Sequence, residues 1–172
     1  FLLPIRQLLI VLFVLAMPVI VPLLFSAEFI GAIPMAISAS FFMFFKALTL
    51  PAAYLALAKG DSGVYMVTEL TYDVFVAIAI PYAFKLWGLE GAGWALSVAG
   101  FLYMLLIHVV YSIRYGYCFD FGKVGLYLVQ FVCISVAVIT ALQDNSWVKI
   151  ITAVAFIFSA VVSFQVLKKE TQ

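Results

Sequence analysis

Residues 41–87 read FFMFFKALTLPAAYLALAKGDSGVYMVTELTYDVFVAIAIPYAFKLW, two long apolar runs joined by the short polar break KGDSG at 59–63. A helix needs roughly 20 apolar residues to cross the hydrocarbon core of a bilayer. Backbone amides in hydrocarbon must bond within their own segment, so each run is expected to be helical. The stretch therefore predicts a hairpin of two membrane-spanning helices.

The composition of the whole chain agrees with that prediction. Of 172 residues, 67% are hydrophobic and only 10% are charged, and the mean hydropathy is +1.25. A soluble domain carries roughly 25% charged residues. We therefore expect an integral membrane protein in contact with a lipid bilayer. A net charge of +1 offers no basic surface for phosphates, which argues against a nucleic-acid partner.

Similar apolar runs extend outward from the hairpin in both directions. They lack the alternation of a membrane β-barrel, so the expected fold class is all-α, a polytopic membrane protein with six transmembrane helices. The predicted spans are 7–25, 30–58, 62–87, 92–113, 124–142 and 147–167.

The basic residues of the short loops predict the orientation, because cytoplasmic loops are enriched in Lys and Arg. The larger group lies on one side of the predicted spans, which places both ends of this segment in the cytoplasm. That group is Arg6, Lys59, Arg114, Lys123, Lys168 and Lys169, against Lys85 and Lys149 on the other side.

Three charged residues, Lys46, Glu69 and Asp73, lie well inside the predicted spans. A charge at a helix centre costs roughly 2.5–3.5 kcal/mol on insertion scales, so such residues are functional-site candidates. In an antiparallel hairpin that turns at Lys59, Lys46 and Asp73 are predicted at nearly the same depth, roughly 20 Å from the turn. Glu69 lies one helical turn from Asp73, on the same face. We expect Lys46 to pair with Asp73, with Glu69 close by.

Two interpretations of this expected pair remain open. A neutralised ion pair could only hold the hairpin together. Alternatively, Lys46, Glu69 and Asp73 could line a polar cavity that binds an anionic head group or a coupling cation.

Other polar residues are weaker candidates. Tyr54 and Tyr72 could line a sugar-binding cavity, as could Tyr65 and Tyr82, because tyrosine combines an apolar ring with a polar tip. His108 lies near the predicted cytoplasmic end of its helix and is a candidate for proton coupling. Packing and an interfacial position are the simpler explanations for these residues.

The sequence favours neither an enzyme nor a metal protein. GxSxG, HExxH and P-loop motifs are absent. One histidine and two cysteines are too few for an ordinary zinc site. No catalytic residue and no cofactor are expected.

Four motifs are distinctive: LLFSAEF at 23–29, YLALAKGDS at 54–62, TEL at 68–70 and GLEGAGWALS at 88–97. Through them, residues 1–113 resemble the C-terminal lobe of bacterial polysaccharide flippases, the O-antigen translocases of the MOP, or MATE-like, exporter superfamily. Residues 114–172 match only by hydropathy, like the additional pair of C-terminal helices in larger members. We therefore expect two divisions, 1–113 and 114–172.

The resemblance implies the C-terminal lobe of a two-lobed transporter in the bacterial cytoplasmic (inner) membrane. Its substrate would be a polyprenyl-pyrophosphate-linked glycan, flipped to the outer leaflet for cell-surface polysaccharide synthesis. Lys46 would attract the pyrophosphate, and Glu69 and Asp73 would tune the charge of the cavity or bind a coupling H⁺ or Na⁺.

The chain begins FLLPIRQ and is interpreted as the C-terminal part of a longer chain whose N-terminal lobe would be its partner. Two alternatives to the flippase stay open. One is a cation-coupled multidrug exporter of the same superfamily, and the other is a polytopic membrane enzyme that acts on lipid-linked glycans.

Overall fold

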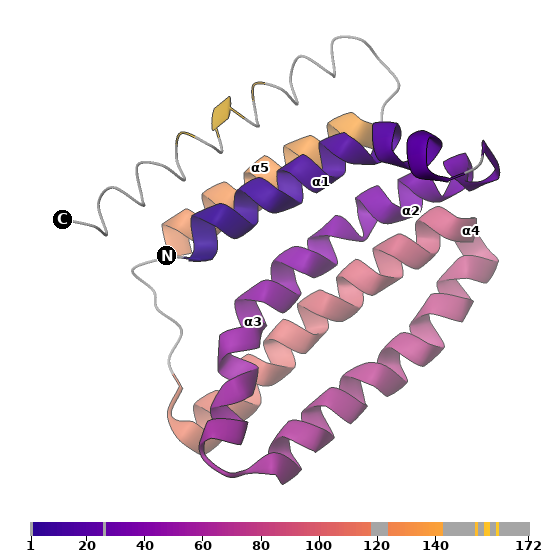
Figure 1. The fold of residues 1–172 in the computed structure, drawn as a ribbon. Helices are drawn as coiled ribbons and strands as arrows, with labels where there is room; N and C mark the ends of the chain where they lie inside the picture. Colours follow the sequence, from indigo (N-terminus) through magenta and orange to yellow (C-terminus); the bar gives the residue numbers. More distant parts are fainter. Residues whose placement is uncertain are drawn as a thin grey trace. The chain divides into compact units, whose positions relative to one another are not determined.

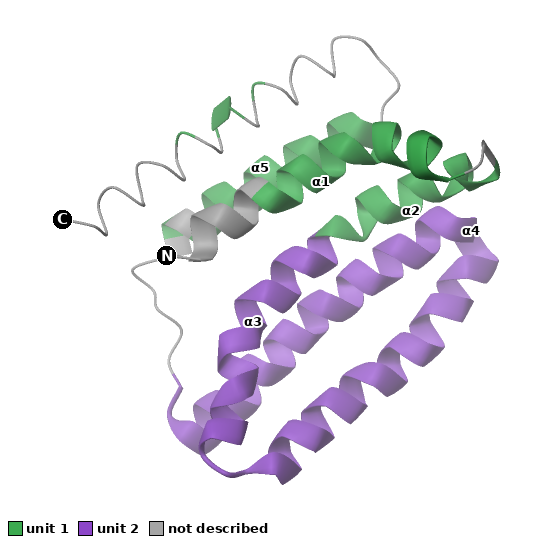
Figure 2. Cartoon of the chain, viewed as in Figure 1, with its two compact units in different colours: residues 1–40, 122–172 green, residues 41–121 purple. Residues whose placement is uncertain are grey.

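The computed structural model describes residues 2–25, 27–117 and 124–142, together with 154, 157, 158 and 161, and these residues form helices and no strand. They divide into two compact units (Figure 2). Unit 1 comprises 1–40 and 122–172, and unit 2 comprises 41–121. The units are defined by packing, whereas the expected division at residue 113 was defined by resemblance and stays a prediction.

Unit 1 contains helices α1 (Leu2–Leu24), η1 (Ala27–Ala32), α2 (Ile33–Ser38) and α5 (Val124–Leu142). Helix α1 packs along α5, and α2 contacts both of them. Fully buried Val11 and Val14 lie on α1, and Ile134 and Val138 on α5. These apolar faces form the interior of the unit. The predicted span 147–167 falls almost entirely outside the described residues.

The predicted single helix over 30–58 is wrong, because the structure divides it into three elements. Helix η1 ends at Ala32, α2 ends at Ser38, and α3 (Ser40–Ala58) follows after one residue. The Ser38 hydroxyl donates to the carbonyl of Met35, and the Ser40 hydroxyl donates to that of Ala36. Serine hydroxyls that bond to the preceding turn bend helices, and here two of them flank the interruption.

Unit 2 is built from α3 and α4 (Ser62–Tyr115), and Figure 1 shows α4 reversing its direction. Helix α4 is interrupted at Gly88, whose φ of 66° and ψ of −151° lie outside the helical region. A side chain would be strained in that conformation, whereas glycine adopts it freely. We call 62–87 the first leg of α4 and 89–115 the second leg. They correspond to the spans predicted over 62–87 and 92–113.

The reversal between the legs also depends on Gly91. A Cβ atom at this position would lie 2.6 Å from Trp87 Cβ and 2.7 Å from the carbonyl oxygen of Ala83. Only glycine lets the second leg begin this close to the end of the first. The GLEGAG segment is therefore a sharp reversal with helical residues on both sides of Gly88, rather than a loop.

At the opposite end of the first leg, the KGDSG corner (59–63) connects the end of α3 to the start of α4. Asp61 N–H donates to the carbonyl of Ala56 at 2.8 Å, and Gly60 N–H donates to that of Leu57 at 3.0 Å. This pair of bonds is the Schellman arrangement that commonly ends a helix. Asp61 then caps α4, because its Oδ1 accepts a bond from Val64 N–H.

Small residues bring α3 close to the second leg. Ala52, Ala53 and Ala56 of α3 are buried against Tyr103, and the same cluster includes Ile107 and Tyr111. Small side chains allow helix backbones to approach closely, as at helix contacts within membranes. The Tyr111 hydroxyl donates to the carbonyl of Ala53, which satisfies a fully buried polar group.

Among the described residues, α3 and α4 are the two helices that are long and apolar enough to cross a membrane. Each leg of α4 is about 40 Å long at about 1.5 Å per residue. The all-α class is confirmed for the described part of the chain, and the six-span topology stays a prediction.

Candidate functional site

Lys46 on α3 and Glu69 on the first leg form an ion pair inside unit 2. The Lys46 Nζ atom lies 3.2 Å from Glu69 Oε2 and 3.5 Å from Oε1. The two side chains keep only 27% and 24% of their surface exposed. A charge removed from water to this extent needs a partner, and each residue neutralises the other.

Two tyrosine rings surround the same ammonium group. Lys46 Nζ lies 4.2 Å from the centre of the Tyr103 ring and 4.8 Å from that of Tyr72. Both distances are within the roughly 6 Å range of cation–π attraction. The ring centres are 4.9 Å apart, and the planes are tilted by 57°. We call Lys46, Glu69, Tyr72 and Tyr103 the Lys46 cluster.

Tyr103 also fixes the carboxylate. Its hydroxyl donates to Glu69 Oε1 at 2.5 Å, so this oxygen accepts from a tyrosine while Oε2 faces Lys46. Hydrogen bonds to a charged acceptor are short and strong. Tyr103 is 2% exposed and comes from the second leg, so the cluster joins all three helical segments of unit 2.

The expected ion pair between Lys46 and Asp73 is wrong, because Glu69 is the partner. Asp73 is exposed, and the ammonium group of Lys46 pairs with Glu69 instead. The inward-facing side of the first leg includes Thr68 and Tyr72. Four residues turn a helix by about 400°, so Asp73 lies about 40° beyond Glu69, away from that side. The similar depths predicted for Lys46 and Asp73 were therefore not enough to bring the two side chains together.

The other candidate residues fall into different places. Tyr54 is 53% exposed and lies about 12 Å along α3 from Lys46. Its ring stacks on that of Tyr65, with the ring centres 6.5 Å apart. Tyr82 is 66% exposed. The ring centres of His108 and Tyr117 are 6.3 Å apart, and the two planes are close to perpendicular. His108 also borders a small pocket that Thr49 lines. Of the predicted site residues, Lys46, Glu69 and Tyr72 are brought together, and Asp73, Tyr54 and His108 are not.

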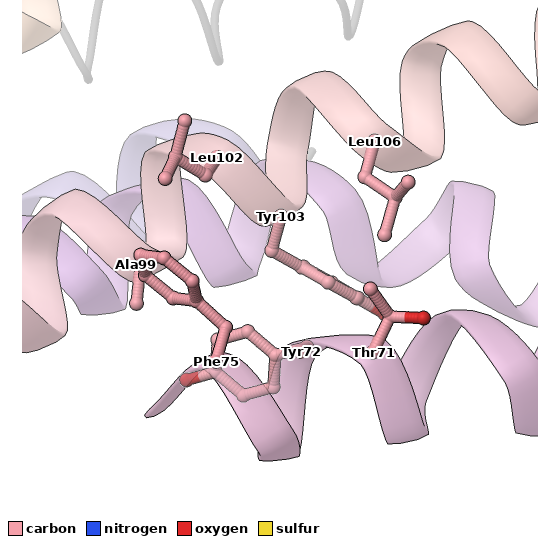
Figure 3. Close-up of a pocket in the computed structure, with 7 residues that line it drawn as sticks. All are labelled: Thr71, Tyr72, Phe75, Ala99, Leu102, Tyr103 and Leu106. Atoms are coloured by element: carbon pink, nitrogen blue, oxygen red, sulfur yellow. The ribbon is translucent and has the colours of Figure 1, made fainter. Parts of the chain in front are cut away.

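A cavity of about 210 Å³ adjoins the Lys46 cluster between the two legs of α4 (Figure 3). Tyr72 and Tyr103 belong both to its lining and to the cluster. The remaining lining is mostly apolar and comprises Thr71, Phe75, Ala99, Leu102 and Leu106. The cavity can therefore take a small, mostly apolar group that lies along Leu102 and Phe75 and reaches Tyr72 and Tyr103.

A second polar cluster lies at the KGDSG corner. Asp61 Oδ2 accepts from Arg114 at 2.8 Å and from the Tyr115 hydroxyl at 2.9 Å. Lys59 Nζ lies 5.0 Å from the centre of the Tyr115 ring. The Tyr115 and Arg114 hydrogen bonds lower the pKa of Asp61 below its ordinary value of 3.8. We call these four residues the Asp61 cluster; it ties the start of α4 to its end.

Sequence reasoning missed Tyr103 and the Asp61 cluster. Tyr103, Ile107 and Tyr111 are all buried and recur every four residues, which places them on one helix face. That spacing was the available signal for Tyr103. Pairing of Asp61 with Arg114 depends on the reversal at Gly88, which brings two residues of one long helix together.

The described residues hold no group of three His, Cys, Asp or Glu side chains that could bind a metal ion. Searches of protein-family models, curated proteins and solved structures found no match to the chain.

Proposed function

We propose that this chain belongs to a membrane transporter that flips polyprenyl-pyrophosphate-linked oligosaccharides, with the Lys46 cluster at its anion-binding site. The observation that carries the proposal is the placement of Lys46. Its ammonium group is half-buried, is neutralised by Glu69 and lies against the rings of Tyr72 and Tyr103, which line a cavity. The KGDS and GLEGAG motifs, from which the flippase resemblance was drawn, lie at the two ends of the first leg of α4.

The distribution of apolar surface supports a membrane location. Large apolar residues, of which Ile78 is 68% exposed, make up most of the outward side of the first leg, although Asp73 is also exposed there. The inward side contributes the charge of Glu69. A bilayer favours helices whose polar groups face the interior of the bundle and whose apolar groups face the lipid. The apolar residues are Met66, Val67, Leu70, Val74 and Ile78.

In this proposal Lys46 exchanges one anion for another. Glu69 holds the ammonium group when the site is empty of substrate, and a phosphate oxygen replaces the carboxylate when substrate arrives. The number of opposite charges facing Lys46 is then preserved. This matters because an unpaired charge in a low-dielectric interior costs several kcal/mol, on the order of 3–5. Tyr103 keeps a hydrogen bond on Glu69 during the exchange and lowers the cost of separating the pair.

The test uses the complete gene, deleted in its own host, and measures in which leaflet the lipid-linked oligosaccharide lies. Deletion should leave the glycan on the cytoplasmic side, and the wild-type gene should restore its transfer. Lys46→Ala should fail to restore it, and Lys46→Arg should restore part of it because Arg also binds phosphate.

Lys85→Ala is the matched control, since Lys85 is an exposed lysine near the end of the first leg. Immunoblots of the membrane fraction must show equal amounts of each variant. A normal leaflet distribution in the deletion strain, without a redundant flippase, contradicts the proposal. Loss of drug efflux in that strain would instead favour the multidrug exporter, and glycan processing by the purified protein would favour the enzyme.

A further inference from the structure

Lys46 occupies a site whose parts are those of an ammonium receptor. One carboxylate lies 3.2 Å from its nitrogen, and two aromatic rings lie within 5 Å of it. Aromatic faces and a carboxylate are the groups that recognise alkylammonium ligands. We propose that Glu69, Tyr72 and Tyr103 form a binding site for small alkylammonium ions, which Lys46 occupies from within the chain.

Contacts other than those with Lys46 also hold the receptor groups. Tyr103 is almost fully buried, and its hydroxyl bonds to Glu69 Oε1, so ring and carboxylate are fixed to each other. Tyr72 packs between Tyr103 and Phe42, whose ring is 6.2 Å away and nearly parallel. A site that is already ordered loses little conformational entropy when a ligand binds.

The adjoining cavity supplies room for the rest of a ligand. Tyr72 and Tyr103 form part of its wall, and Phe75 and Leu102 add apolar surface. Its volume of about 210 Å³ accommodates an ion with several methyl groups.

The tether explains why the site would be closed to outside ions in the resting protein. A group attached to the chain competes at a high effective concentration, on the order of millimolar or above for a short flexible connection. An external ammonium therefore binds only weakly while Lys46 is in place. When an anion draws Lys46 away, the receptor is vacated, so anion and cation binding favour each other.

The experiment uses the full chain in lipid nanodiscs and tetramethylammonium as the probe, with thermal unfolding as the readout. Ligands that bind the folded state raise the unfolding temperature. We expect Lys46→Ala to bind tetramethylammonium at least about ten-fold more tightly than the wild type, because the competing ammonium is gone. The double variant Lys46→Ala, Glu69→Gln should lose most of this gain.

Three further measurements separate the receptor from simpler explanations. Lys46→Ala with Tyr72→Leu should bind several-fold more weakly than Lys46→Ala alone, because one aromatic face is missing. Na⁺ at the same concentration should stabilise Lys46→Ala less than tetramethylammonium does. Lys85→Ala should respond like the wild type.

The proposal is overturned if Lys46→Ala binds the probe no better than the wild type, or if Glu69→Gln and Tyr72→Leu leave its binding unchanged. Equal stabilisation by Na⁺ would also overturn it, since a bare carboxylate would then suffice. If Lys46→Ala does not fold, Lys46→Met retains an apolar stem in its place and is assayed in the same way. Binding is measured without glycan, so failure of the flippase proposal would not affect this result.

Discussion

The two polar clusters of unit 2 are built from the same parts but lie in different surroundings. Each has a carboxylate that accepts from a cation and from a tyrosine hydroxyl, and each has a lysine over a tyrosine ring. In the Lys46 cluster both charged side chains are about one-quarter exposed. In the Asp61 cluster, Asp61 is likewise 26% exposed, whereas Arg114 is 56% exposed.

The two ion pairs differ in the exposure of the cation. At the corner, the largely exposed Arg114 stays hydrated if the pair opens, so the pair contributes less. In the Lys46 cluster both side chains are about one-quarter exposed, so opening the pair leaves both charges poorly hydrated, and each partner constrains the other. The Lys46 cluster is therefore suited to respond to a competing ion, whereas the Asp61 cluster has a structural role in linking the start of α4 to its end.

The largest effect is expected when one partner of the deep pair is removed. Glu69→Gln leaves Lys46 half-buried without an opposite charge, and we expect a loss of about 3 kcal/mol in the free energy of unfolding. The double variant Lys46→Met, Glu69→Gln should recover most of that loss, since no charge then remains. Equilibrium unfolding in mixed detergent micelles measures both. Additive losses in the double variant would show that the two residues do not interact.

The second effect concerns the tyrosine hydroxyls. Tyr103→Phe removes the hydrogen bond to Glu69 Oε1 but keeps the ring over Lys46, and we expect a loss of about 2 kcal/mol. Tyr115→Phe removes the equivalent bond at the corner, where water can replace it, and should cost clearly less. The same unfolding measurement compares the two. Equal losses would contradict the role given to burial.

A smaller effect is expected at the corner ion pair. Arg114→Ala should lower the thermal unfolding temperature only slightly, because Arg114 is largely exposed. The difference from the wild type should shrink further as salt rises from about 0.01 M to about 1 M, because screening weakens exposed pairs. Lys46→Ala should keep its deficit over the same range. A deficit of Arg114→Ala that does not change with salt would argue against an exposed electrostatic contact.

The smallest effect is a pH dependence at Asp61. Hydrogen bonds from Tyr115 and Arg114 lower its pKa in the folded state, so its contribution is present above the unfolded value and is lost as pH falls through the lowered pKa. Asp61→Asn keeps a capping side chain but removes the charge. The difference in unfolding temperature between wild type and Asp61→Asn should therefore diminish as the pH falls through 3.8 and below. A difference that grows toward acid pH would reverse the assigned sign.

The helical segments follow from local sequence pattern, but the break between α2 and α3 does not. The apolar runs over 62–87, 92–113 and 124–142 predict helices that the structure contains, since the length of an apolar run is a local property. The interruption near Ala39 depends on the hydroxyls of Ser38 and Ser40 bonding to the preceding turn. Serine is tolerated in many helices, so its presence alone did not predict a break.

The candidate site was predicted in part for a related reason. Depth along a helix follows from counting residues, and this placed Lys46 close to the acidic residues of the first leg. Rotation about the helix axis depends on which side packs inward, and this favoured Glu69 over Asp73. Tyr103 comes from the third helical segment, and its contact with Glu69 required the reversal at Gly88.

The sequence by itself determined the helical class, the two legs of α4 with the KGDSG and GLEGAG turns, and the presence of charged residues within the apolar runs. Each of these follows from composition or from the spacing of residues along one segment. Only the tertiary structure decided which charges meet, which tyrosines surround Lys46 and where a cavity lies. The reason is physical: a hydrogen bond or ion pair depends on ångström distances between side chains from different segments, and packing sets those distances.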